Sequence, residues 1–134
     1  MSDNNEFLNY TTGIQHIGIP TNNLDKTIAF YKNLGFDIIL ETINEVANER
    51  VTFLKLKTLV LEIYENKAAT LRSGAIDHIA LDVLDIKKTY EYIKSINLNT
   101  TNDEIHFLPF WENGVNFFTI EGPNKEKIEF SQYL

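Results

Sequence analysis

The sequence predicts an α+β protein built from two βαβββ modules within one domain. The first observation is an internal repeat, because residues 14–19 (IQHIGI) recur 62 residues later as residues 76–81 (IDHIAL). The second is that the hydrophobic period changes in the same order in both copies, from alternation to helical spacing and back to alternation. A repeat constrains architecture more firmly than local propensity does, so we expect the same five elements twice.

In the first copy, residues 14–19 alternate and are rich in isoleucine, which predicts a strand. Three apolar residues then fall at helical spacing: Leu24, Ile28 and Tyr31. Either Asn22 or Asn23 can cap the start of this helix, and Gly35 stands where it should end. Three further strands are expected, near residues 36–42, 49–56 and 58–65.

The second copy repeats this order. Residues 76–81 predict its first strand, and Asp85 can cap the helix that follows. Three residues mark that helix by their spacing: Ile86, Tyr90 and Ile93. The remaining strands are expected at residues 98–101, 115–121 and 126–132. The boundaries are therefore an N-terminal extension at 1–12 and a single domain at 13–132, with modules at about 13–66 and 75–132.

Composition narrows the function classes. The 134 residues carry a formal charge of −7, which disfavours nucleic acid and anionic membrane surfaces as partners. There is no cysteine, so a disulfide framework or a thiolate metal site is excluded. The first residues are polar and acidic, unlike a signal peptide, and no apolar run is long enough for a membrane helix. We expect a cytoplasmic protein that acts on a small molecule.

Two histidines and two glutamates occupy equivalent places in the repeat. His16 and His78 stand in the first strand of each module, and Glu62 and Glu129 stand in the last. A single strand histidine is commonly a hydrogen-bonded core residue, and a single strand glutamate commonly faces water. A carboxylate on an apolar strand is nevertheless costly to bury unless it is paired or metal-bound. The four together suit one divalent ion of nickel, cobalt, zinc, manganese or iron.

The paired modules with His16, Glu62, His78 and Glu129 resemble the vicinal oxygen chelate superfamily, which includes glyoxalase I (lactoylglutathione lyase) and bleomycin resistance proteins. The resemblance spans residues 13–132. It implies a curved eight-stranded mixed sheet around a cup, with these four residues binding a divalent metal ion at its floor. It also implies a homodimer, in which one site can take ligands from one chain or from both.

The order histidine, glutamate, histidine, glutamate resembles glyoxalase I in particular. This implies a lyase or isomerase that abstracts a proton from a hemithioacetal or an α-hydroxycarbonyl substrate through a metal-bound enediolate. Glu129 is then the base, with Glu62 as its counterpart in the other module. Asn66 matches an asparagine that contacts glutathione in glyoxalase I.

The segment 106–112 (HFLPFWE) is rich in aromatic residues. Phe107, Phe110 and Trp111 can form an apolar lid over the substrate or simply cap the sheet. His106 can act as an acid or base or be an ordinary surface residue. Two other functions remain open on the same fold: a metal-dependent dioxygenase or thiol transferase, and a drug-binding protein like the bleomycin resistance proteins.

Overall fold

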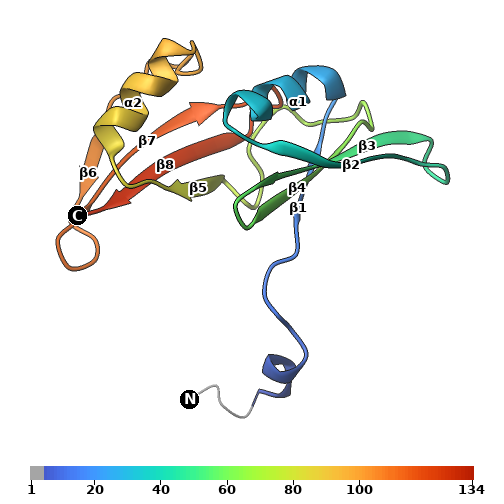
Figure 1. The fold of residues 1–134 in the computed structure, drawn as a ribbon, viewed down its shortest axis with the longest axis horizontal. Coiled ribbons are helices and arrows are strands. Elements are labelled where there is room, and N and C mark those ends of the chain that lie inside the picture. Colours follow the sequence, from blue (N-terminus) through green and yellow to red (C-terminus); the bar gives the residue numbers. More distant parts are fainter. Residues whose placement is uncertain (1–4) are drawn as a thin grey trace.

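The computed structural model describes residues 5–134, which form two modules that lie beside each other (Figure 1). The elements of the first are β1 (Ile17–Pro20), α1 (Leu24–Asn33), β2 (Asp37–Asn44), β3 (Glu49–Leu56) and β4 (Leu59–Tyr64). Those of the second are β5 (His78–Asp82), α2 (Ile86–Ser95), β6 (His106–Leu108), β7 (Val115–Glu121) and β8 (Lys127–Tyr133). The predicted α+β class and the paired βαβββ modules are confirmed.

The eight strands are hydrogen-bonded as two four-stranded mixed sheets. Their orders are β1-β4-β3-β2 and β5-β8-β7-β6. In each sheet the first strand pairs in parallel with the last strand of its module, while the other pairs are antiparallel. The internal repeat of the sequence is therefore a repeat of topology and register.

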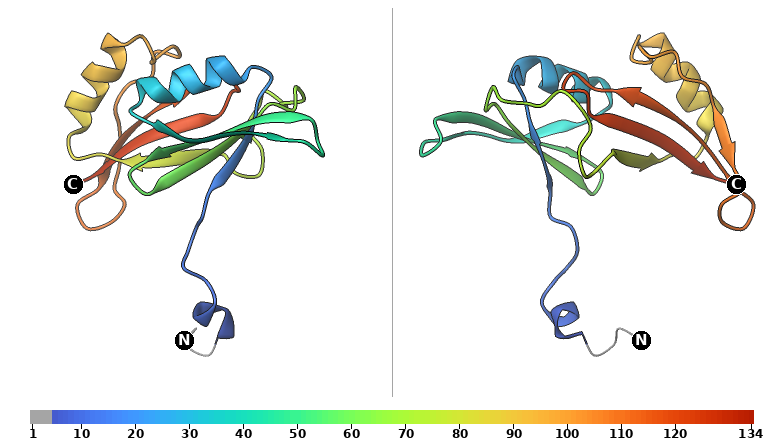
Figure 2. Two further views of the ribbon diagram at one scale, coloured as in Figure 1. Left: turned by 45° about the vertical axis from the view of Figure 1, so that its right-hand side comes forward. Right: turned by 180° about the vertical axis from the view of Figure 1, so that it is seen from behind.

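Each helix covers one face of its own sheet. Helix α1 packs on β3 and β4, and α2 packs on β7 and β8. The buried core lies between helix and sheet and includes Tyr31, Leu61, Ile63, Phe118 and Ile128. Both helices lie on the same side of the molecule (Figures 1 and 2). We call the opposite, uncovered face of each sheet its open face.

The helices begin and end where the sequence indicates. The side chain of Asn23 accepts a hydrogen bond from the backbone N–H of Lys26, and Asp85 accepts one from Lys88, so both are N-caps. Asn22 instead accepts from the N–H of Ala69. Ala69 belongs to the linker, by which we mean residues 65–77 between β4 and β5. Gly35 follows α1 with φ +94°, a conformation that a residue without Cβ adopts readily.

One predicted strand was wrong. Residues 98–101 do not form a strand, and the edge strand of the second sheet is β6 at His106–Leu108. Asn97 and Asn102 have φ of 60° and 55°, the left-handed region in which asparagine is tolerated. The stretch between them is a turn, closed by a hydrogen bond from the N–H of Asp103 to the side chain of Asn99.

The N-terminal extension reaches away from both modules (Figure 2). It carries a short 3-10 helix, η1 (Glu6–Asn9), in which no residue is buried. Phe7, Leu8 and Tyr10 are all exposed. The expected extension covers residues 1–12, of which 1–4 lie outside the described residues.

Buried polar side chains join the two modules. The Thr21 hydroxyl donates to Asn124 Oδ1 at 2.7 Å, and the Tyr31 hydroxyl donates to Glu126 Oε2 at 2.9 Å. Thr21 and Tyr31 have no exposed surface. These bonds connect module 1 with the turn between β7 and β8, so the modules are held in one relative position within the chain.

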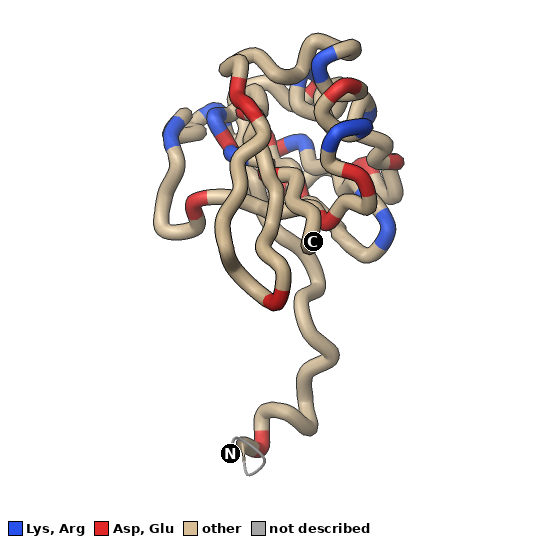
Figure 3. The backbone as a smooth tube through the Cα atoms, turned by 90° about the vertical axis from the view of Figure 1, so that its left-hand side faces the viewer, with Lys and Arg blue, Asp and Glu red and all other residues tan. Residues whose placement is uncertain are grey.

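Charged residues do not form a one-sided basic surface. In Figure 3 the basic and acidic positions are interspersed along the backbone. No helix between residues 5 and 134 has the length and apolar character needed to cross a membrane.

Candidate metal-binding half-sites

The first predicted pair of ligands meets on the open face of module 1. Strand register places Gly18 opposite Glu62, while Leu61 and Ile63 point into the core. His16 immediately precedes β1 and alternates with Ile17, so its ring falls on the same face as Glu62. His16 Nε2 lies 3.2 Å from Glu62 Oε1.

The second pair repeats this arrangement in module 2. Ala80 lies opposite Glu129 in the parallel pair of β5 and β8, and Ile128 and Phe130 are buried beneath α2. His78 Nε2 lies 3.6 Å from Glu129 Oε1. A small residue, glycine or alanine, therefore stands beside each pair.

The other nitrogen of each imidazole is held by the preceding residue. His16 Nδ1 lies 2.9 Å from Gln15 Oε1, and His78 Nδ1 lies 2.9 Å from Asp77 Oδ2. The hydrogen bond from His78, and then that from Lys127, holds the pKa of Asp77 below its ordinary value. A partner on Nδ1 fixes the tautomer that leaves Nε2 available to a metal, as in many metal sites of proteins.

These distances fit two ligands of one divalent ion. Ligand nitrogen and oxygen atoms lie at about 2.0–2.2 Å from zinc, so two neighbouring donors are separated by about 3–3.5 Å. The separation in module 1 falls within this interval and that in module 2 is slightly longer. Each pair by itself supplies two ligands, which is half of the predicted set.

The two pairs do not meet within one chain. Among residues 5–134, no third histidine, aspartate or glutamate joins either pair to make a group that can hold a metal. The structure thus brings His16 to Glu62 and His78 to Glu129, but it does not bring the four together. Within residues 5–134 the two pairs are therefore separate.

The residues predicted to bind substrate lie in different surroundings. Asn66 is in the linker, where its side chain accepts a hydrogen bond from the N–H of Ala68. Phe107, Phe110 and Trp111 are exposed at 57%, 55% and 72%. The Trp111 ring meets that of Tyr133 edge-on at 5.4 Å.

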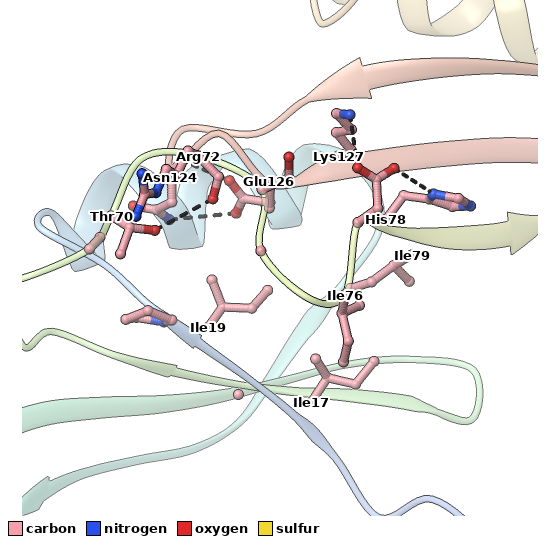
Figure 4. A pocket seen from close by; sticks show the side chains of 16 residues that line it. Ile17, Ile19, Thr70, Arg72, Ile76, His78, Ile79, Asn124, Glu126 and Lys127 are labelled. Atoms are coloured by element: carbon pink, nitrogen blue, oxygen red, sulfur yellow. Dashed lines mark hydrogen bonds and ion pairs between the residues drawn. The ribbon is translucent and has the colours of Figure 1, made fainter.

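A cavity of about 200 Å³ lies between the modules, beside the linker (Figure 4). Ile17, Ile19 and Ile76 give it an apolar wall. On its polar side Lys127 Nζ donates to Asp77 Oδ1 at 3.0 Å. Because Asp77 also holds His78, the cavity borders the second half-site.

Sequence reasoning missed two kinds of residue. Gln15 and Asp77 were not singled out, although both precede the repeated histidines and this shared position was the available signal. Asp103 was missed as the partner of His106, whose Nε2 lies 2.7 Å from Asp103 Oδ1. A spacing of three residues is also common for ion pairs on a protein surface. The pairing of β6 with β7 is needed to place His106 on one face of the sheet.

A family model and a relative of known sequence both match most of the chain. The family model described as "Glyoxalase/Bleomycin resistance protein/Dioxygenase superfamily" matches residues 13–130. The uncharacterized protein YwbC of Bacillus subtilis (strain 168) is 32% identical over 124 residues, which are 89% of this chain and 96% of that protein.

Solved structures share the fold at low identity. A glyoxalase family protein from Enterococcus faecalis superposes with a TM-score of 0.74 at 21% identity, covering 91% of this chain and 98% of that chain. The fosfomycin resistance protein FosX from Listeria monocytogenes, in complex with Mn(II) and sulfate, gives 0.68 at 17% identity, covering 92% and 94%.

Proposed function

Since the chain belongs to the glyoxalase/bleomycin resistance protein/dioxygenase superfamily, we propose that it is a divalent-metal-dependent lyase or isomerase of the glyoxalase I type. The observation that carries the proposal is the duplicated pair of one imidazole and one carboxylate, each on an open face. Its substrate is a hemithioacetal or another small α-hydroxycarbonyl compound.

We further propose that two copies of the chain share each metal site. His16 and Glu62 of one copy would face the pair equivalent to His78 and Glu129 on the other. A twofold dimer then contains two such sites, because every contact made by one copy is made in return by the other. The two carboxylates balance the charge of a divalent ion, which lowers the cost of burying it.

When bound, the metal supplies Lewis-acid stabilisation of negative charge on the two adjacent oxygens of the substrate. The chain's own residues then hold and move the proton. Glu129 takes the carbon-bound proton and returns it to the neighbouring carbon, because a carboxylate beside the bound substrate reaches both positions. Glu62 balances charge across the site, while Gln15 and Asp77 keep the imidazoles oriented.

Metal content, measured by mass spectrometry on protein purified without added metal or chelator, tests the proposal. We expect about one ion per chain in the native protein, and loss of that ion in His16→Ala and Glu62→Ala. Glu91→Gln, on the exposed side of α2, is the matched control and should keep its metal. Absence of metal after titration with nickel, cobalt, zinc and manganese would contradict the proposal.

Glu129→Gln separates metal binding from chemistry. We expect this variant to retain at least part of the metal affinity and to lose turnover of methylglyoxal hemithioacetals by about 100-fold or more, the usual contribution of a general base. Activity is measured with the metal found in the native protein, again beside Glu91→Gln. Unchanged turnover would remove Glu129 from the role of base.

A second assay uses fosfomycin with Mn(II), because FosX has a similar fold and was crystallised with that ion. Modification of fosfomycin without turnover of any hemithioacetal would replace the lyase proposal by an antibiotic-modifying one.

A further inference from the structure

We propose that His106, oriented by Asp103, binds an oxyanion substituent of the substrate, either a carboxylate or a phosphonate, on the open face of module 2. The inference rests on the proposed function, which places the substrate over that face. It names a determinant of specificity that lies outside the two half-sites.

Asp103 is held as an ionised carboxylate. Its Oδ1 lies 2.7 Å from His106 Nε2, and its Oδ2 accepts a hydrogen bond of 2.8 Å from the N–H of Thr119. Burial by itself raises the pKa of Asp103, but the hydrogen bonds from His106 and from the N–H groups of Thr119 and Glu104 outweigh it. The pKa of Asp103 therefore lies below its ordinary value.

The backbone of Asp103 is fixed as firmly as its side chain. Its carbonyl accepts hydrogen bonds from the Tyr90 hydroxyl at 2.8 Å and from Asn99 Nδ2 at 3.0 Å. Tyr90 belongs to α2, and its ring packs edge-on against Phe118 in the core. The dyad of Asp103 and His106 is thus attached to the helix and the sheet, and its geometry does not depend on a bound ligand.

Strand register places His106 on the same face as Glu129. His106 pairs with Phe117, and Thr119, two residues further along β7, pairs with Glu129. Paired residues and residues two apart in a strand share one face. The imidazole lies against the Phe117 ring, with centroids 5.5 Å apart, and half of its side chain remains exposed.

His106 and Glu129 stand on strands that are not neighbours, and the His106 ring is held by Asp103 and Phe117. Two strand spacings of about 4.8 Å separate β6 from β8, so the two backbones lie about 10 Å apart across the sheet. A proton transfer needs a donor and acceptor within about 3 Å. His106 can therefore reach a substituent at the far end of a substrate whose reacting carbon is at Glu129, and it is a binding residue and not a catalytic one.

The dyad has no counterpart in module 1. The position of module 1 that matches His106 is Thr42, because Thr42 pairs with Val51 as His106 pairs with Phe117. Val51 pairs in turn with Tyr64, two residues after Glu62, as Phe117 pairs with Ser131, two residues after Glu129. The same fold is thus built in module 1 with a threonine at this edge.

His106 is the candidate for binding an anion among the side chains of its segment. Residues 101–115 contain three acidic residues and neither lysine nor arginine, so His106 is the one side chain there that can carry a positive charge. Asp103 shares its charge with the N–H groups of Thr119 and Glu104. An imidazole whose Nε2 donates to Asp103 can present its other ring nitrogen to an oxyanion.

NMR titration of the full chain tests this without a metal. Acetate and methylphosphonate are added in separate titrations, and acetamide serves as the neutral probe. Comparison of the acetate and methylphosphonate titrations shows whether the bound oxyanion is a carboxylate or a phosphonate. We expect the ring signals of His106 and the amide signals of Phe117 and Thr119 to move with an anion and not with acetamide. In His106→Gln the amide shifts should disappear, and in His106→Lys they should return. Shifts that persist in His106→Gln would overturn the proposal.

A second experiment measures affinity in the metal-loaded protein by calorimetry. Glutaric monohydroxamate is compared with its terminal amide, which has the same length and no charge. We expect the carboxylate to bind about 10-fold more tightly, a difference of about 1.4 kcal/mol. That ratio should fall to about one in His106→Gln, recover in His106→Lys and persist in Thr42→Gln, the matched position of module 1.

An unchanged ratio in His106→Gln would contradict the role of His106 while leaving the metal site intact. Failure of both hydroxamates to bind a metal-loaded protein would instead contradict the chelation step of the proposed function. The NMR titration would then still decide whether His106 binds an oxyanion.

Discussion

Tyr31 carries a buried hydroxyl whose single hydrogen bond crosses from one module to the other. It donates to Glu126 Oε2 at 2.9 Å, and the second oxygen of Glu126 accepts from the N–H of Asn124 at 2.7 Å. Burial, followed by the charge of Glu126 and the hydrogen bond to it, raises the pKa of Tyr31 well above its ordinary value. The phenol is thus neutral in the folded protein.

Tyr31→Phe should destabilise the fold by about 2 kcal/mol, because a hydrogen bond to a charged group is lost and the carboxylate keeps fewer donors. Since the folded pKa of Tyr31 exceeds the unfolded one, its contribution is complete below the unfolded value of about 10 and declines above it. The difference between native protein and Tyr31→Phe should therefore shrink from about pH 8 to about pH 11.

Urea unfolding at both pH values measures this trend. Tyr92→Phe removes the same hydroxyl at an exposed site on α2 and should show little effect at either pH. A penalty for Tyr31→Phe that is the same at both pH values would show that the phenol ionises equally in the folded and unfolded chain.

The two histidine–glutamate pairs could be predicted from the sequence because the repeat placed these residues at matching positions of matching strands. Their partners on Nδ1, Gln15 and Asp77, could not be separated from ordinary polar residues. A hydrogen bond between adjacent side chains depends on rotamers that the local sequence does not specify.

At the scale of the element, the loop before β7 depends on a glycine in close contact with β6. Gly114 has φ +94°, and a Cβ built on it would overlap Phe107 Cε1. Gly35 has the same φ, but its Cβ would meet only Leu56 Cδ1 at 3.6 Å, an ordinary contact. The two glycines therefore differ in steric space and not in backbone conformation.

Gly35→Ala should lower the free energy of unfolding by about 1–2 kcal/mol, the strain of a Cβ at positive φ. Gly114→Ala should lower the free energy of unfolding by the same amount and by about 1–3 kcal/mol more, because Phe107 must move and β6 with it. Thermal or urea unfolding of both variants measures the difference. In the double variant Gly114→Ala with Phe107→Ala the extra cost should vanish. Equal penalties for the two single variants would show that Phe107 moves freely.

β6 is also the element that sequence reasoning placed wrongly. Each of the strands β3, β4, β7 and β8 contains two buried residues at alternate positions, which makes a strand period readable in the sequence. β6 has three residues, all exposed, so it has no such alternation. Its position is set by pairing with β7, which is a tertiary feature, after the local turn at residues 97–102.

At the scale of the whole molecule, the chain presents two half-sites on two open faces. Each holds one imidazole and one carboxylate, and the cross-module bonds of Thr21 and Tyr31 fix the modules in a position that keeps the halves apart. The sequence could predict the two histidine–glutamate pairs but not this separation. The relative position of the modules depends on the geometry of the segment between them and on cross-module hydrogen bonds, which leave no local pattern in the sequence.

Complementation between two inactive variants tests the shared site most directly. His16→Ala and His78→Ala should each lose metal when purified alone, because every site in either homodimer lacks one ligand. When the two are co-expressed and the mixed dimer is isolated, one of its two sites has all four native ligands and the other lacks two. Metal content and turnover per mixed dimer should therefore recover to about half the native value. A mixed dimer that binds no metal, while the native dimer does, would contradict a site shared between two chains.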